Sequence, residues 1–164
     1  MRTPARVAGH PIHPMLVAFP IGLWVFSFVC DLIFLAARAL AWNTTAYFAL
    51  FGGIVGAVSA AVPGLVDGLF LRKSPIFRTV LTHMALNLLA LMMFVLSFLS
   101  RSIEAPFSWS LTLSAIGLVS LAIGGWFGGE LVFVHGLGVE PPAEHRYPIQ
   151  AQSEPPPRSL RRSS

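Results

Sequence analysis

The run MLVAFPIGLWVFSFVCDLIFLAA, residues 15–37, decides the fold, because Asp31 is its single charged side chain. A bilayer hydrocarbon core about 30 Å thick is crossed by roughly 20 apolar residues in an α-helix. Barrel strands are about half as long, and lipid-exposed backbone must satisfy its hydrogen bonds internally. The run therefore predicts a transmembrane helix.

Three further apolar stretches of similar length follow, at residues 46–66, 79–100 and 109–134. Only 11% of the 164 residues are charged and 55% are hydrophobic, whereas a soluble domain carries about 25% charged residues. This composition excludes a soluble enzyme, a nucleic-acid-binding module and a disordered protein. We predict an all-α integral membrane four-helix bundle in residues 1–139, threaded up-down-up-down and in contact with the lipid bilayer.

The basic residues predict the orientation of the bundle. With four spans, both termini and the middle connection lie on one side, and the other two connections lie on the opposite side. The first side holds Arg2, Arg6, Arg72, Lys73, Arg78, Arg146, Arg158, Arg161 and Arg162, and the second holds Arg38 and Arg101. Cytoplasmic loops carry an excess of Lys and Arg, so we expect both termini in the cytoplasm.

Residues 140–164 form a Pro-rich basic tail that ends in Arg161-Arg162 before two serines. The tail lacks apolar periodicity, so we expect it to be disordered. Contact of its basic end with anionic lipid and an inert role in fixing orientation remain open alternatives.

Ionisable side chains gather at the predicted cytoplasmic boundary. His10 and His13 precede the first span, His83 lies about one turn inside the third, and His135 closes the fourth. Asp67 ends the second span at the same level. Ionisable groups at membrane depth are costly and often mark a ligand site or a relay. We predict a functional cluster here, with simple fastening of helix ends as the alternative.

Two cofactor types suit this cluster. Haem b needs two axial imidazoles, and we expect His83 and His135 to supply them, with His10 and His13 holding propionates or a metal, or replacing one axial ligand. Alternatively, the histidines and Asp67 would bind zinc, iron or copper. The sequence has no Cys-x-x-Cys-His motif for covalent haem attachment.

Small and polar side chains mark two further helix faces. Asn87 lies one turn beyond His83, so we expect it to hydrogen-bond the imidazole or a ligand. Gly117, Gly124 and Gly128 share nearly one face of the fourth span. That face is either a packing seam or a surface for a flat macrocycle.

A short internal repeat relates the two halves of the chain. The fragment at residues 13–16 (HPML) is similar to that at 83–86 (HMAL), and residues 66–69 (VDGL) are similar to 134–137 (VHGL). Two hairpins related by an axis along the membrane normal give such a pattern.

Motifs at both ends of the bundle resemble one bacterial membrane family. They are GHPIHPMLV at residues 9–17, FPI at 19–21, GGWFGGELV at 124–132 and HGLGV at 135–139. The pattern resembles the domain-of-unknown-function 2231 family, four-helix proteins with an HPxHP start and a GGxxGGxLV end. The resemblance implies a bacterial inner membrane protein. Similar members are fused to Rieske-like or cytochrome c-like domains, which implies a redox setting by association.

Two functions follow from these observations. The first is electron transfer through a haem or metal held by His10, His13, Asp67, His83 and His135, with a redox protein or larger membrane complex as partner. The second is an assembly or scaffolding subunit, because small residues at Gly52, Gly56, Ala60 and Gly64 suit close helix contact, and a homo-oligomer is compatible with either. We find no catalytic constellation, so we expect a cofactor-binding protein rather than an enzyme.

Overall fold

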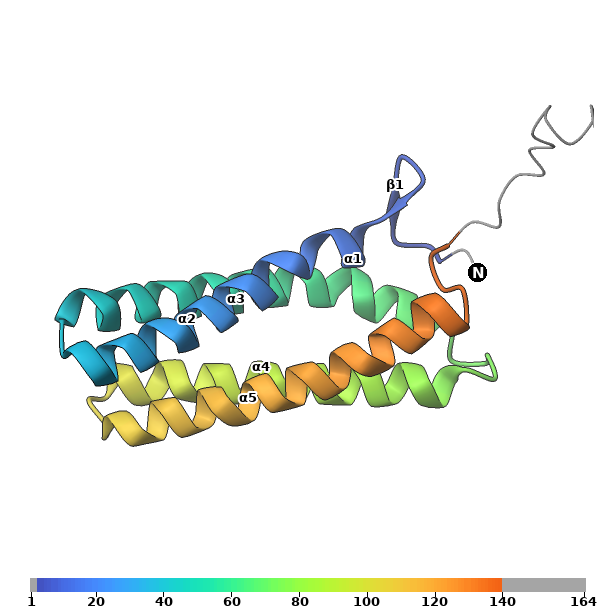
Figure 1. Ribbon diagram of the computed structural model, residues 1–164. Coiled ribbons are helices and arrows are strands. Elements are labelled where there is room, and N and C mark those ends of the chain that lie inside the picture. The colour runs from blue at the N-terminus through green and yellow to red at the C-terminus, as the bar shows by residue number, and fades with distance from the viewer. Residues whose placement is uncertain (1–2, 140–164) are drawn as a thin grey trace, which may run out of the picture.

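A computed structural model describes residues 3–139, which form a bundle of long helices with a small hairpin at one end (Figure 1). The predicted tail, residues 140–164, lies outside the described residues, as do His145 and Arg2. The elements in chain order are β1 (Arg6–Val7), β2 (His10–Pro11), α1 (Ile12–Leu16), α2 (Ala18–Ala37), α3 (Leu40–Phe70), α4 (Phe77–Ser102), α5 (Phe107–Gly129) and the π-helix η1 (Glu130–Val134).

Within the described residues, four helical segments are long and apolar enough to cross a membrane. They cover Ile12–Ala37, Leu40–Phe70, Phe77–Ser102 and Phe107–Val134. The predicted four-helix membrane fold is therefore confirmed. The helices run beyond the predicted spans, because hydropathy marks the residues suited to lipid, whereas backbone hydrogen bonding continues into more polar sequence. The expected connection at 38–45 shortens to Arg38 and Ala39, since α3 already begins at Leu40.

The first span contains one interruption, at Val17 between α1 and α2. Pro20 explains its position, because proline has no backbone N–H to donate to the carbonyl of Leu16 one turn earlier. Arg38 ends α2 in the left-handed conformation (φ 57°), and its N–H donates to the carbonyl of Phe34. This is a common way to end a helix.

The helices pack as two antiparallel hairpins, α2 with α3 and α4 with α5 (Figure 1). The β1–β2 hairpin and the end of η1 lie at the same end of the bundle in Figure 1. We call this the histidine end. The α2–α3 and α4–α5 turns lie together at the other end.

The two hairpins are built from equivalent contacts at a fixed residue offset. The Ser27 hydroxyl in α2 donates to the carbonyl of Ala46 in α3 (2.7 Å), and the Ser97 hydroxyl in α4 donates to the carbonyl of Ser110 in α5 (2.9 Å). The offset is 70 residues from α2 to α4 and 64 residues from α3 to α5. The same offsets recur in every layer described below, so the two hairpins are related by a pseudo-two-fold axis along the bundle.

Equivalent residues also meet each other on this axis. Trp24 stacks on Phe94 near the middle of the bundle, with ring centroids 4.1 Å apart and an interplanar angle of 17°. Each ring also presses on a glycine of its own hairpin. A Cβ added to Gly53 would lie 2.4 Å from the Trp24 ring, and one added to Gly117 would lie 3.0 Å from Phe94. These glycines therefore let the axial aromatics approach the neighbouring backbone.

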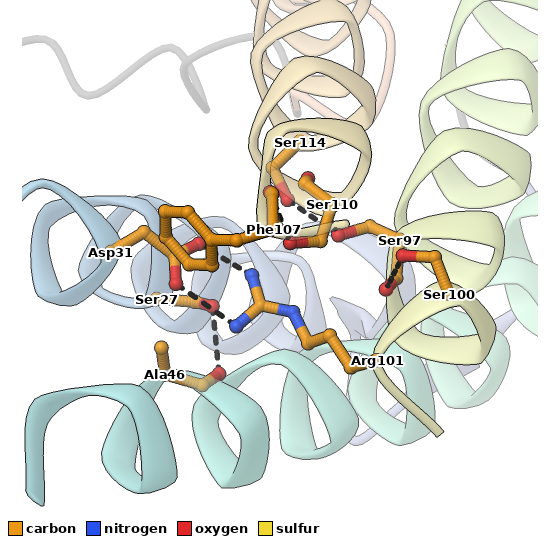
Figure 2. Close-up of polar contacts among 9 residues, drawn as sticks. All are labelled: Ser27, Asp31, Ala46, Ser97, Ser100, Arg101, Phe107, Ser110 and Ser114. Atoms are coloured by element: carbon orange, nitrogen blue, oxygen red, sulfur yellow. Dashed lines mark hydrogen bonds and ion pairs between the residues drawn. The ribbon is translucent and has the colours of Figure 1, made fainter. Parts of the chain in front are cut away.

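An ion pair crosses the axis near the end opposite the histidines (Figure 2). Both guanidinium Nη atoms of Arg101 donate to Asp31, at 2.9 and 2.5 Å, and the two side chains are 9% and 0% exposed, respectively. The serine bonds of both hairpins lie beside this pair in Figure 2. Arg101 is the residue equivalent to Asp31 at the 70-residue offset, so the pair joins the two hairpins at their common axis.

The internal repeat read from the sequence has the correct register in one of its two fragments. The match of His13 with His83 has the 70-residue offset seen in the structure. The match of residues 66–69 with 134–137 is wrong, because the contacts relate Gly64 to Gly128, an offset of 64.

Candidate functional site

Two imidazoles face each other on the axis at the histidine end. His13 lies in α1 and His83 lies in the second turn of α4. Their ring centroids are 6.3 Å apart and their planes are nearly perpendicular, at 89°. We call these two residues the histidine pair. Each member of the pair is the first residue of its repeat fragment, and the sequence analysis predicted both at the same membrane boundary.

Each imidazole is oriented by a backbone carbonyl of its own hairpin. The Nδ1 of His13 lies 2.8 Å from the Ala60 carbonyl in α3, and the Nδ1 of His83 lies 2.8 Å from the Gly124 carbonyl in α5. A carbonyl oxygen only accepts hydrogen bonds, so both Nδ1 atoms carry the proton and donate it. In the neutral imidazole this leaves Nε2 with a lone pair. Both rings therefore offer the nitrogen that a metal or a proton would take.

A glycine beside each imidazole leaves the space that the ring occupies. A Cβ on Gly64 would lie 2.7 Å from His13 Nδ1, and one on Gly128 would lie 2.9 Å from His83 Cε1. Such contacts are too close for any residue larger than glycine without movement of the ring. The predicted glycine strip at Gly117, Gly124 and Gly128 is thus a packing seam for the side chains of α4 in this structure.

The Asn87 side chain lies against His83. Its Nδ2 donates to the His83 carbonyl at 2.8 Å and lies 3.3 Å from His83 Nδ1. Because Nδ1 donates to Gly124, the amide does not bond to the ring and instead flanks it. A Cβ on Gly124 would lie 2.8 Å from Asn87 Nδ2, so this contact also depends on glycine. Asn87 therefore restricts how the His83 ring is able to turn.

The β1–β2 hairpin is held to the bundle by Asp67. The Ala5 backbone N–H donates to Asp67 Oδ1 at 2.8 Å, across 62 residues of sequence. The Arg6 guanidinium donates to the carbonyls of Gly9 (3.1 Å) and Gly138 (3.3 Å). Asp67 thus fastens the segment that leads directly into His13.

Removal of the Asp67 carboxylate is expected to release this hairpin. In Asp67→Ala, the amides of residues 3–11 should exchange hydrogen faster, because a hydrogen bond to a charged group contributes about 1.5–3 kcal/mol. Asp67→Asn keeps an acceptor oxygen and should retain most of the protection. Hydrogen exchange followed by mass spectrometry in detergent measures both variants. Equal exchange in wild type and Asp67→Ala would contradict the assigned role.

The remaining two described histidines have other partners. His10 is exposed in β2, and its Nδ1 donates to the Ala8 carbonyl at 3.0 Å. His135 follows η1, and its Nε2 lies 3.7 Å from Glu130 Oε1. In an α-helix, residues five apart lie about 140° apart around the axis. The π-helix changes this, because its i→i+5 bond from His135 N to Glu130 O (3.1 Å) aligns the two residues.

The sequence predicted a larger cluster than the structure assembles. Among residues 3–139, no group of three or more His, Cys, Asp or Glu side chains lies close enough to hold a metal ion. His13 rather than His135 is the imidazole whose ring faces His83. Asp67 holds the Ala5 amide and His135 lies beside Glu130. Whether any of these residues binds a metal stays a prediction.

Comparison with protein families agrees with the motifs at the two ends of this bundle. A family model described as a predicted membrane protein, DUF2231, matches residues 9–141. The chain belongs to the DUF2231 family. The match includes both members of the histidine pair and the glycines behind them, so the site lies inside the part of the chain that defines the family. No curated protein and no solved structure matches the chain.

The sequence did not reveal the ion pair between Asp31 and Arg101. Both residues were visible as rare charges near the boundary opposite the histidines, but nothing local indicated that they meet. The 70-residue offset between His13 and His83 was the available signal, since the same offset leads from Asp31 to Arg101.

Proposed function

We propose that this DUF2231 protein is a multipass electron-transfer protein whose redox cofactor is held by His13 and His83. The observation that carries the proposal is the pair of facing imidazoles, each with Nδ1 bonded to a carbonyl and Nε2 left available. Metal-binding histidines commonly donate their other ring N–H to a carbonyl or carboxylate, which fixes the tautomer and the ring orientation.

The separation of the rings fits ligation of one metal centre. A metal ion held by both imidazoles would lie about 2.0–2.1 Å from one nitrogen of each ring, so the two rings would have to be close neighbours. The observed separation is 6.3 Å. His13 and His83 would also be able to hold haem b, which would supply one-electron transfer with a potential set by its ligands and burial. We therefore favour haem b, with zinc, iron or copper as the alternative centre.

Neighbouring groups that orient both rings support the proposal. Ala60 and Gly124 orient the imidazoles, and Asn87 flanks His83. Gly64 and Gly128 let the rings lie against backbone. We further propose a bacterial inner membrane location with the histidine end cytoplasmic, supported by the excess of Arg and Lys in the segments at that end.

The test is absorbance, haem content and metal content of detergent-purified protein from cells supplied with haem precursors. We expect a Soret band in the wild type and its loss in His13→Ala and His83→Ala. His10→Ala and His135→Ala are the controls that keep the band. Each variant is also checked for folding by circular dichroism.

The other outcomes have defined meanings. A bound transition metal without a Soret band would exclude haem b and keep a metal centre. Loss of the band in His135→Ala with retention in His13→Ala would move the axial pair to His83 and His135 and overturn the pairing proposed here. Absence of both haem and metal from folded wild type would overturn cofactor binding.

The scaffolding alternative has less support from the structure. The small residues of α3 that suggested a partner surface face inward. A Cβ added to Gly52 would meet Leu23, one on Gly56 would meet Pro20, and one on Gly64 would meet His13. A scaffold would also leave bound cofactor unchanged in His13→Ala and His83→Ala while altering assembly with other membrane proteins. Quantifying co-purified proteins in the same samples separates this function from electron transfer.

A further inference from the structure

A groove on the outer face of α5 lies behind the histidine pair. It is an open cavity of about 550 Å³, lined by Gly125, Trp126, Gly129, Glu130, Phe133 and Val134. Trp126 and Phe133 are strongly exposed, at 77% and 88%. The groove spans the last turns of the fourth membrane span and the π-helix.

Only the α5 backbone separates this groove from His83. On the inner face, a Cβ on Gly128 would lie 2.9 Å from the His83 ring, and the Gly124 carbonyl accepts the bond from His83 Nδ1. On the outer face, Gly125 and Gly129 line the groove, and a Cβ on Gly125 would meet nothing within 4 Å. A flat ligand in the groove therefore approaches the backbone that holds the imidazole.

An acid that lines the groove lies near a base just beyond its lining. Glu130 lines it, and the Glu130 carboxylate lies 3.7 Å from His135 Nε2. This distance is longer than a hydrogen bond, and the two side chains are 36% and 29% exposed, respectively. Both groups are thus accessible to a ligand. A carboxylate accepts a hydrogen bond from a hydroxyl, and an imidazole N–H donates one to a carbonyl.

We propose that the groove binds a membrane quinone, with its head group against the exposed rings of Trp126 and Phe133, one oxygen at Glu130 and the neighbouring His135 within reach. The flat ring matches the aromatic walls, the quinone carbonyl matches the imidazole donor, and the quinol hydroxyl matches the carboxylate. Exposed Ile116, Val119 and Ile123 continue along α5 away from the boundary and give the isoprenoid tail an apolar path.

This inference deepens the proposed function, because it names the electron-carrying partner. The binding itself does not require the cofactor, so it is measured separately. Trp126 supplies the readout, since a quinone bound against an indole quenches its fluorescence.

The experiment titrates decylubiquinone or menaquinone-1 into detergent-purified full-length protein and follows tryptophan fluorescence. We expect saturable quenching in wild type and loss of the saturable part in Trp126→Phe. Trp109→Phe is the matched control, because Trp109 is also exposed (61%) and also on α5, toward its other end. Trp109→Phe should lower the total tryptophan fluorescence but leave the saturable quenching by quinone.

A second variant fills the groove without disturbing the core. Gly125→Leu places a side chain where a Cβ meets nothing within 4 Å, and Gly22→Leu does the same on α2. We expect Gly125→Leu to weaken quinone affinity by about tenfold or more and Gly22→Leu to leave it unchanged. Glu130→Gln is expected to weaken quinol binding more than quinone binding.

Several results would overturn the quinone site. These are quenching that rises linearly without saturation, saturable quenching that survives Trp126→Phe, and equal affinity in Gly125→Leu and wild type. A change of oligomeric state in Gly125→Leu with no change in quinone affinity would assign the groove to a second copy instead.

Haem and metal content are measured on the same samples. Quinone binding without a cofactor overturns only the proposed function, and cofactor without quinone binding overturns only this inference.

Discussion

Replacing Asp31 or Arg101 alone by alanine is expected to lower the free energy of unfolding by about 3–5 kcal/mol, because each change leaves an uncompensated buried charge. The Asp31 carboxylate is 0% exposed and receives both Nη atoms of Arg101. Unfolding in mixed detergent micelles, followed by circular dichroism, measures the loss. Replacement of both residues by leucine should cost much less than either single change.

The pseudo-two-fold axis gives this prediction a sharper control. Asp31 and Arg101 occupy equivalent places, each one turn beyond an equivalent serine that bonds to a carbonyl of its own hairpin. The exchanged protein, Asp31→Arg with Arg101→Asp, should therefore recover most of the stability lost in the single variants. If the exchanged protein is as unstable as Asp31→Ala, the two environments are not equivalent.

Adding a methyl group at Gly53 is expected to destabilise the centre of the bundle. In Gly53→Ala, the Cβ would lie 2.4 Å from Cδ1 and Nε1 of Trp24, and Trp24 is only 2% exposed and stacks on Phe94. The indole therefore has little room to move away. Overpacking of this kind costs about 1–3 kcal/mol and sometimes more.

Two other glycines complete a graded series measured by the same unfolding assay. Gly117→Ala should cost less than Gly53→Ala, because its Cβ would lie 3.0 Å from Phe94. Gly22→Ala should be neutral or stabilising by about 0.5–1 kcal/mol, since alanine favours the helix and the position is open. A large loss in Gly22→Ala, or none in Gly53→Ala, would contradict the packing described for the axis.

The membrane fold was predictable because it depends on the length and hydropathy of continuous runs. The helix ends were less predictable, since Leu40 and the residues that follow it continue a helix that hydropathy alone begins at residue 46. The interruption at Val17 and the π-helix after Gly129 depend on a missing N–H and on one shifted hydrogen-bond register. Local features of this kind are not predicted by composition or hydropathy.

The candidate site was predictable in part, for a related reason. Placing His13 and His83 at one end required only the threading of the helices. Choosing which imidazoles face each other required the rotation of each helix about its own axis, which hydropathy and threading alone do not give. His135 was expected opposite His83, but the π-helix aligns it with Glu130. The short repeat at His13 and His83 contained the needed information, because equivalent residues meet on a two-fold axis.

The ion pair on the axis also determines which hairpins are able to associate. The α2–α3 hairpin carries Asp31 on the axis and the α4–α5 hairpin carries Arg101. If two copies of the chain exchanged hairpins, a pairing of two like hairpins would bring two carboxylates or two guanidinium groups together in a buried layer. Like charges there repel strongly because water does not screen them. One unlike pair of residues thus favours the association of an α2–α3 hairpin with an α4–α5 hairpin over either pairing of like hairpins.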